Sequence, residues 1–349
     1  MSEFELNLLP TAVGSLPHEE PKEACELVMK YLPQIPAWPQ LPKRTFLENM
    51  YAQFSEGFPG IVLEDERIYV DRGRDLDPGL ERLYVAYLEN DVDYGATSPE
   101  YAAGLPQLIA SLVPRPSSLV AIKGQVTGPI SWGLTVVDQN RRPVLYDEVL
   151  ADAVAKHLRL KAAWQERELR KIAPTTIIFV DEPYLCAFGS AFVSLSREQV
   201  VQYLEEVFAG IEGIKGTHCC GNTDWSILLS TALDILNFDA YSYAESLSLY
   251  PDDVKAFLKR GGVIAWGIVP NDEKVMDETV ESLVRRLHDA MSLLVEKGVP
   301  LDDMINAALI TPSCGLRSLS IEAAERALEL TAAVSAAMRK RYGQTSGSQ

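Results

Sequence analysis

The residues best suited to chemistry in this sequence are one histidine and two cysteines. His218 and Cys220 stand two positions apart at the end of a predicted strand, residues 214–217. Residues i and i+2 of an extended chain point to the same side, so both side chains can reach one ion. Cys314 follows a second predicted strand, residues 307–310, and precedes a glycine. Two thiolates and an imidazole suit a soft cation, so the pattern predicts a Zn²⁺ site at His218, Cys220 and Cys314.

The fourth ligand of this predicted site has two candidates. Asp239 comes directly after a predicted strand, and Glu245 lies on the loop that follows. The competing interpretation is that the histidine and cysteines are unrelated buried residues, but a further cysteine on another strand end, followed by glycine, favours the metal. The chain has five cysteines with irregular spacing, which is typical of free thiols rather than of a disulfide framework. Cys25 and Cys186 are expected to be packing residues.

Several other polar side chains also follow predicted strands. Asp181 comes directly after a fully apolar strand, where a carboxylate either starts a helix or binds a cationic group of a substrate. Ser15 follows the first strand, and His18 on the same loop is either a loop cap or a substrate contact. His157 and His288 lie among charged residues in helical patterns, so we expect them on solvated helix faces.

The elements that must position these side chains alternate between strand and helix along nearly the whole chain. Strands are expected at residues 8–13, 35–40, 119–126, 176–180, 214–217, 235–238, 263–266 and 307–310. Helices are expected at residues 148–172, from a Ser196–Gln199 capping box onward, at 280–297 and at 320–341, with a hairpin at 61–70.

This alternation predicts an α/β fold, a single (β/α)8 TIM barrel with insertions in the N-terminal half. The barrel is expected to span residues 1–344, followed by a disordered tail at residues 345–349. The alternative is a doubly wound open sheet, but no glycine-rich nucleotide loop follows any strand. Chemistry in a barrel lies at the carboxyl ends of the strands, which is where the polar residues above are found.

Composition narrows the classes of function. The 349 residues include 32 basic and 49 acidic side chains, and 32 − 49 gives a net charge of −17. Such a chain repels phosphate backbones and anionic lipid, so we expect no nucleic-acid partner and no membrane partner. No apolar run approaches the roughly 18 residues that span a bilayer. The acidic start of the sequence lacks the pattern of a signal peptide, so the protein is expected to be cytoplasmic.

Five segments resemble one barrel superfamily, that of cobalamin-independent methionine synthase, uroporphyrinogen decarboxylase and the corrinoid-dependent thiol methyltransferases. These segments are Gly14-Ser15-Leu16-Pro17, Gly124-Gln125-Val126-Thr127-Gly128-Pro129, Val180-Asp181-Glu182-Pro183, His218-Cys219-Cys220-Gly221-Asn222 and Pro312-Ser313-Cys314-Gly315-Leu316. They are spread over nearly the whole chain. The closest resemblance is to a stand-alone core form of methionine synthase, which corresponds to the catalytic C-terminal half of the double-barrel enzyme.

The resemblance implies an enzyme that makes methionine from homocysteine at a catalytic zinc. It implies His218, Cys220, Cys314 and Asp239 as ligands, with Asp239 in the place of the family's glutamate and Glu245 as its alternative. The implied substrate-binding residues are Gly14 and Ser15 for the carboxylate, Asp181 for the ammonium group, and Gln40. Gln40 lies beside Leu41, which stands where the family has a carboxylate.

The departures from the family concern the methyl donor. The family's histidine on the seventh-strand loop, which assists methyl release from folate, is replaced by Gly267. With that residue and the folate-binding first barrel both missing, we expect methylcobalamin, free or on a corrinoid carrier protein, to replace methyl-tetrahydrofolate. Two alternatives stay open. One is a corrinoid-dependent methyltransferase for another thiol such as coenzyme M, and the other is a non-catalytic subunit that binds zinc or a corrinoid.

Overall fold

The computed structural model describes residues 6–190 and 193–342, so the predicted tail at 345–349 lies outside the described residues. Its centre is a seven-stranded sheet whose neighbouring strands all pair in parallel, in the order β1-β10-β9-β8-β7-β6-β4. The strands are β1 (Leu9–Pro10), β4 (Ile122–Thr127), β6 (Thr176–Asp181), β7 (Ile214–Cys219), β8 (Ile235–Phe238), β9 (Val263–Val269) and β10 (Ala308–Pro312). Because all the strands are parallel, their carboxyl ends meet at one edge of the sheet.

The predicted strand at residues 35–40 is not a regular strand. It makes only isolated parallel bridges, Ala37 with Lys123 on one side and Gln40 with Ser15 on the other. The segment reads IPAWPQ, and its two prolines have no N–H to donate to a ladder. The segment nevertheless lies between the two edge strands of the sheet, β1 and β4, and hydrogen-bonds to residues on both sides.

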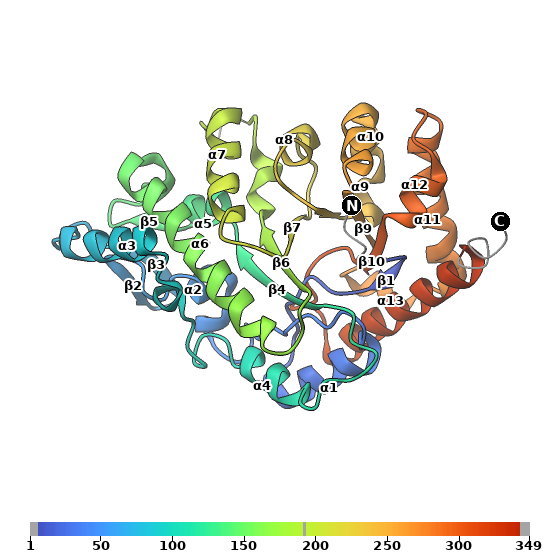
Figure 1. Cartoon of the computed structure of the whole chain (residues 1–349), viewed down its shortest axis with the longest axis horizontal. Helices are drawn as coiled ribbons and strands as arrows, with labels where there is room; N and C mark the ends of the chain where they lie inside the picture. The colour runs from blue at the N-terminus through green and yellow to red at the C-terminus, as the bar shows by residue number, and fades with distance from the viewer. Residues whose placement is uncertain (1–5, 191–192, 343–349) are drawn as a thin grey trace.

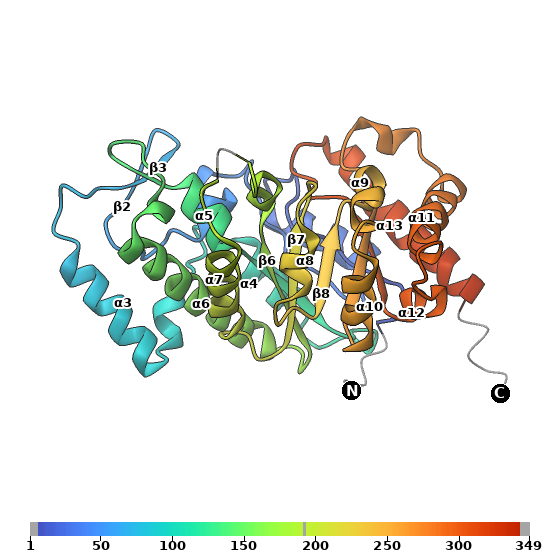
Figure 2. The same ribbon diagram turned by 90° about the horizontal axis from the view of Figure 1, so that it is seen from above.

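Helices surround this sheet, as Figures 1 and 2 show. They are α1 (Pro21–Tyr31), α5 (Pro129–Thr135), α6 (Glu148–Arg170), α7 (Arg197–Phe208), α8 (Trp225–Leu229), α9 (Ala240–Leu247), α10 (Pro251–Lys259), α11 (Val280–Val295), α12 (Leu301–Asn306) and α13 (Ile321–Tyr342). The capping box of Ser196 and Gln199 starts α7, as predicted. Among the described residues, no helix combines the length and the apolar character that crossing a bilayer requires.

The N-terminal half carries the predicted insertion between residues 43 and 113. It contains α2 (Met50–Gln53), α3 (Asp77–Glu89), α4 (Gly104–Ser111) and a hairpin of β2 (Ile61–Glu64) and β3 (Arg67–Val70). Asp65 and Glu66 form the turn of this hairpin with positive φ angles of 49° and 58°. With β5 (Val137–Asp138) the hairpin forms a separate three-stranded sheet, which lies with α3 at the left of Figure 1.

The main sheet has an apolar layer on each face. One face meets the surrounding helices, for example through Ile178 and Val180 of β6. The opposite face forms a smaller cluster, to which β6 contributes Ile177 and Phe179. Its full set is Leu6, Leu9, Ile35, Ala121, Ile177, Phe179, Ile235, Ala265 and Leu309. Because side chains alternate along a strand, the next position on this inner face of β6 is Asp181, at the carboxyl end.

Candidate metal centre

The structure brings the predicted trio of ligands together. His218 is in β7, Cys220 follows that strand directly, and Cys314 follows β10. One nitrogen or sulfur atom from each lies within 4.8 Å of the other two. The His218 Nε2 atom is 3.4 Å from Cys314 Sγ. The imidazole is buried and the two thiols are half-buried. All three side chains lie at the carboxyl ends of their strands.

The electrostatics of the trio favour negative sulfur. A hydrogen bond from Cys314 lowers the pKa of Cys220 to about 4. His218 lowers this pKa further, whereas burial raises it. Hydrogen bonding to Cys220, together with burial, raises the pKa of the Cys314 thiol. Burial lowers the pKa of His218, but its interactions with Cys220, Asp181 and Asn237 together outweigh that effect and raise the pKa. An imidazole and two thiols, one already inclined to ionise, form a donor set that suits Zn²⁺.

The two candidates for a fourth ligand lie in different places. Asp239 is beside the trio at the end of β8, and its Oδ1 accepts a hydrogen bond of 2.8 Å from the Ser242 N–H at the start of α9. Burial raises the pKa of Asp239, and the hydrogen bonds with Ser242 and the charge of His218 oppose that rise only in part. Glu245 is exposed on α9 and lines a different groove. Neither carboxylate belongs to the group within 4.8 Å, so the fourth ligand stays a prediction.

The trio opens onto a pocket of about 170 Å³. It is lined by Val13, Ser15, Gln40, Pro42, Glu48, Met50, Tyr51, Asp181, Pro183, His218, Cys220, Cys314, Gly315 and Arg317. Three predicted substrate-binding residues, Ser15, Gln40 and Asp181, thus share one cavity with the predicted ligands. Gly14, the fourth predicted substrate-binding residue, is not among the residues that line this pocket. Its φ is 145°, and a Cβ there would lie 2.7 Å from the Gln125 side chain.

Asp181 lines the pocket with a buried carboxylate. Its Oδ1 is buried and has no hydrogen-bond partner among the described residues. Burial raises the pKa of Asp181, and the nearby Lys123 ammonium opposes that shift. Lys123 is itself fully buried and donates to the Val13 carbonyl at 2.8 Å. A buried acceptor that faces a pocket fits the ammonium group of a substrate.

The neighbouring Glu182 has a structural role. Its carboxylate accepts hydrogen bonds from the Ile130 and Ser131 backbone N–H groups at 2.9 and 2.8 Å, at the first turn of α5. Glu182 is therefore engaged at the start of a helix, whereas the binding of a substrate by Asp181 stays a prediction.

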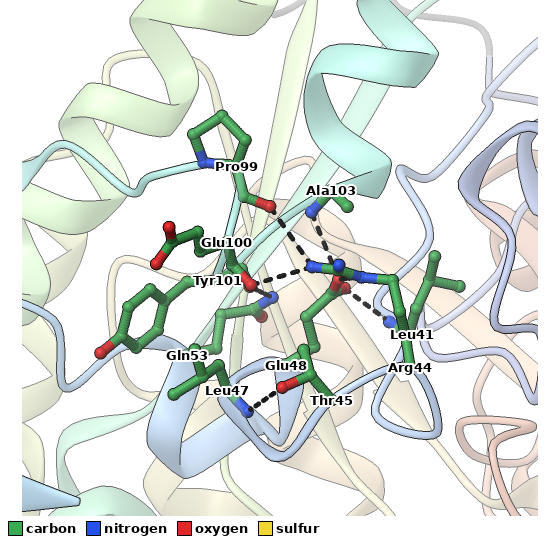
Figure 3. A network of polar contacts seen from close by, with 10 residues as sticks. All are labelled: Leu41, Arg44, Thr45, Leu47, Glu48, Gln53, Pro99, Glu100, Tyr101 and Ala103. Atoms are coloured by element: carbon green, nitrogen blue, oxygen red, sulfur yellow. Dashed lines mark hydrogen bonds and ion pairs between the residues drawn. The ribbon is translucent and has the colours of Figure 1, made fainter.

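Glu48, which lines the pocket, accepts several hydrogen bonds from the segment that follows residue 40, and Figure 3 shows this network. Its Oε2 accepts the Leu41 N–H at 2.9 Å, and its Oε1 accepts from Arg44 Nε at 2.6 Å and from the Ala103 N–H at 3.3 Å. Arg44 in turn donates to the Glu100 carbonyl at 2.9 Å. The Leu41 N–H is thus bound to a buried carboxylate seven residues later in the chain.

Gln40 is held at the pocket by a chain of amide contacts. Its Nε2 donates to Gln53 Oε1 at 2.6 Å, and Gln53 Nε2 donates to the Tyr101 carbonyl at 2.6 Å (Figure 3 shows the second contact). Because its amide nitrogen is engaged, Gln40 faces the pocket with a fixed orientation.

Some sequence predictions outside the trio were wrong. His157 is fully buried rather than solvated, because it lies on the face of α6 that packs against the protein, together with the buried Lys161 four residues later. His288 is half-buried and its ring contacts Tyr342. His18 is buried but does not line the pocket. Cys25 is buried as expected, whereas Cys186 is exposed.

Sequence reasoning missed four residues at or beneath the pocket: Glu48, Lys123, Asn237 and Arg317. Lys123 had a usable signal, since it is a single charge inside an apolar strand. Asn237 lies in such a strand too, between Leu236 and Phe238. Glu48 and Arg317 have no comparable pattern around them.

No family model and no curated protein sequence matches the chain. A B12-independent methionine synthase from Shewanella sp. W3-18-1, solved with selenomethionine, is 18% identical, with a TM-score of 0.57 over 97% of this chain and 99% of that chain. A candidate vitamin-B12 independent methionine synthase from Listeria monocytogenes is 14% identical, with a TM-score of 0.55 over 91% of this chain and 86% of that chain. Over nearly its whole length, the chain therefore has the mixed α/β fold of these methionine synthase structures, as its motifs predicted.

Proposed function

We propose that this protein is a zinc-dependent methyltransferase that makes methionine from homocysteine. The observation that carries the proposal is the convergence of His218, Cys220 and Cys314 within 4.8 Å. The pocket beside them also holds Asp181, whose Oδ1 has no hydrogen-bond partner within the described part of the chain. The fold supports it, since the two structural neighbours are described as methionine synthases.

We further infer that the sheet is a closed eight-stranded barrel and that residues 1–344 form one domain. The segment around residues 35–40 bridges to Ser15 at the end of the first strand and to Lys123 in β4, the two edges of the sheet. Leu9 of β1 and Ala121 beside β4 also belong to the same inner apolar cluster. An open sheet would place its two edge strands far apart, so this shared cluster favours closure.

The side chains of the pocket have distinct roles in this proposal. His218, Cys220 and Cys314 would hold Zn²⁺, with Asp239 as the fourth ligand. Bound zinc supplies Lewis acidity, which favours the thiolate form of a thiol substrate. Asp181 accepts a charge-assisted hydrogen bond from the substrate ammonium, and Ser15 donates to the substrate carboxylate.

Methyl transfer then needs little from the protein beyond orientation. The sulfur of homocysteine, having lost its proton, forms the new bond to the methyl carbon with its own electron pair. The bond between that carbon and the donor breaks, and its electron pair stays on the donor. A tetrahydrofolate donor leaves as an amine and needs a proton, whereas methylcobalamin leaves cob(I)alamin and needs none.

The backbone around Gly267 bears on the choice of donor. A Cβ at this position would lie 2.3 Å from the Phe238 carbonyl oxygen and 2.9 Å from Ser313 Cα. No side chain fits there, so the strand packing excludes an acid at the family's histidine position. We therefore propose methylcobalamin, free or on a carrier protein, as the donor. The neighbours are described as B12-independent, which favours methyl-tetrahydrofolate instead, so the donor must be tested directly.

The test is a donor screen with zinc-loaded protein and homocysteine, read out as methionine formed. We expect turnover with methylcobalamin, and a rate with methyl-tetrahydrofolate that is lower by at least the ~10²-fold that general acid assistance supplies. Comparable rates with both donors would contradict the donor assignment but not the zinc site.

Asp181→Ala tests the acceptor thiol in the same assay. We expect it to impair methylation of homocysteine, because the substrate ammonium loses its partner. Coenzyme M has no ammonium group, so methylation of that thiol by the wild type and equally by Asp181→Ala would replace homocysteine as the substrate. Corrinoid or zinc binding without turnover of either thiol would indicate a non-catalytic binding subunit.

A further inference from the structure

Asn237 is a buried residue of β8 that connects four strands beneath the metal centre. It lies directly opposite His218 of β7 in the register of the sheet. Its Oδ1 is 2.6 Å from His218 Nδ1. Its Nδ2 donates to the Ala265 carbonyl of β9 at 2.9 Å and to the Thr311 hydroxyl oxygen of β10 at 2.8 Å.

These contacts determine which nitrogen of His218 carries the proton. The Ala265 carbonyl can only accept a hydrogen bond, so the NH₂ end of the Asn237 amide must face β9 and β10. The amide oxygen then faces His218, and an oxygen acceptor requires a proton on Nδ1. In the neutral ring, Nε2 is left with its lone pair, and this atom is the one 3.4 Å from Cys314 Sγ.

We infer that Asn237 is a positioning residue that fixes His218 in the Nδ1–H tautomer and aims its Nε2 at the metal. The inference rests on the proposed zinc site. Histidine ligands commonly donate their second ring N–H to an outer partner, which sets the tautomer and the ring orientation. Here the outer partner is the neutral amide of Asn237, and its hydrogen bond to the Ala265 carbonyl fixes the orientation of that amide.

The first test needs neither zinc nor turnover. The chain has four histidines, so selective ¹⁵N labelling of histidine gives few signals, and His218→Gln identifies the one that belongs to His218. In metal-free wild type with a neutral ring, we expect the ¹⁵N shifts and couplings of an Nδ1–H tautomer. An Nε2–H tautomer in the wild type would overturn the inference without any variant at Asn237.

The second test compares the zinc affinity of variants by competition with a chromogenic chelator. We expect Asn237→Leu to lose the tautomer preference and to bind zinc about 10–100-fold more weakly, as is typical when an outer partner of a ligand is removed. Asn237→Asp keeps an acceptor for the Nδ1 proton but loses the donor to the Ala265 carbonyl, so it should retain the tautomer and bind zinc more tightly than Asn237→Leu.

Thr217→Val is the matched control. It removes a buried hydrogen bond of 2.6 Å to the Val180 carbonyl from the residue next to His218, yet leaves Asn237 untouched. We expect lower stability but unchanged zinc affinity. If Asn237→Leu loses no more affinity than this control, Asn237 is merely structural and the inference is wrong.

The two failures can be told apart. Wild type that binds no zinc would refute the proposed function, while the tautomer measurement still decides the role of Asn237. If Asn237→Leu does not fold, the wild-type tautomer and the affinity of Asn237→Asp still test the inference.

Discussion

Asp181 and Glu182 are adjacent acidic residues that serve different purposes. Glu182 accepts hydrogen bonds from the Ile130 and Ser131 N–H groups at the N-terminus of α5. Asp181 lines the pocket with one buried oxygen unpartnered among the described residues. Leaving a buried acceptor unsatisfied costs about 1–3 kcal/mol, which a bound cationic group would offset. Glu182 thus has a structural role, whereas the carboxylate of the adjacent Asp181 is available to a ligand.

The metal site makes its clearest prediction at Cys314. We expect purified wild type to hold about one zinc per chain. Cys314→Ser should weaken zinc binding by more than the roughly 10–100-fold typical of outer-shell changes, because a hydroxyl replaces a thiolate ligand. Metal analysis with chelator competition measures this. Cys25→Ser is the control, since Cys25 is buried elsewhere and contacts the Gly104 carbonyl. Stoichiometric zinc retained unchanged in Cys314→Ser would refute the ligand assignment.

The fourth ligand can be tested separately from the capping role of Asp239. Asp239→Asn keeps an oxygen that accepts the Ser242 N–H, so the melting temperature should change little. Zinc affinity should fall, because a neutral amide is a weaker ligand than a carboxylate. Glu245→Gln, on the exposed face of α9, should change neither quantity. If Glu245→Gln lowers the zinc affinity and Asp239→Asn does not, the fourth ligand is Glu245 rather than Asp239.

Among the elements, α6 connects several separate segments through buried polar side chains. His157 contacts the Phe54 carbonyl at 2.9 Å, and Lys161 donates to the Ala96 carbonyl at 2.7 Å. Gln165 donates to the Gln125 carbonyl of β4 at 2.9 Å. Glu166 accepts from the Gly213 N–H at 2.6 Å, just before β7. Positions spaced four apart share a helix face, so α6 fixes the N-terminal insertion against the sheet.

The buried His157 on this face of α6 predicts that the stability of the fold decreases in acid. Burial, assisted by the Lys161 charge, lowers the pKa of His157 to about 3. The unfolded chain binds this proton near pH 6.5, whereas the folded chain resists it until about pH 3. Stability from this group is therefore complete above pH 6.5 and falls as the pH drops toward 3, by up to about 1.4 kcal/mol per pH unit.

Urea unfolding across this pH range checks the prediction. His157→Gln, which cannot titrate, should flatten the acid slope, whereas His288→Gln at a half-buried site should keep most of it. An unchanged slope in His157→Gln would assign the acid sensitivity to other groups.

At the scale of the whole molecule, the large apolar cluster extends from Leu8 to Met338. The two ends of the described chain also meet, since Ser335 Oγ donates to the Leu8 carbonyl at 2.6 Å and Lys30 of α1 pairs with Glu325 of α13. Residues at both ends thus belong to the same core, as expected for a closed barrel.

Because the large apolar cluster includes residues of both the sheet and the N-terminal insertion, we expect a single unfolding transition. Differential scanning calorimetry of the full chain should give one peak whose calorimetric and van't Hoff enthalpies agree. Two resolved transitions would show that the insertion between residues 43 and 113 folds as a separate unit, and would contradict one domain over residues 1–344.

The sequence by itself determined the parallel strands, the capping of α7, the hairpin and the identity of the trio. Each of these is a local signal. His218 and Cys220 share a side of one strand end because side chains alternate, and Cys314 lies at the end of another strand. Parallel strands bring such ends to one edge, so the position of the site followed from the pattern of elements alone.

Only the tertiary structure decided the contacts between segments distant in sequence. The burial of His157 depends on Phe54, and the orientation of His218 depends on Asn237 and Ala265. Local periodicity carries no information about such partners, because each hydrogen bond exists only after the sheet has brought separate strands into register. For the same reason, the pattern that identified Asp239 could not say whether its carboxylate caps α9, binds a metal, or does both.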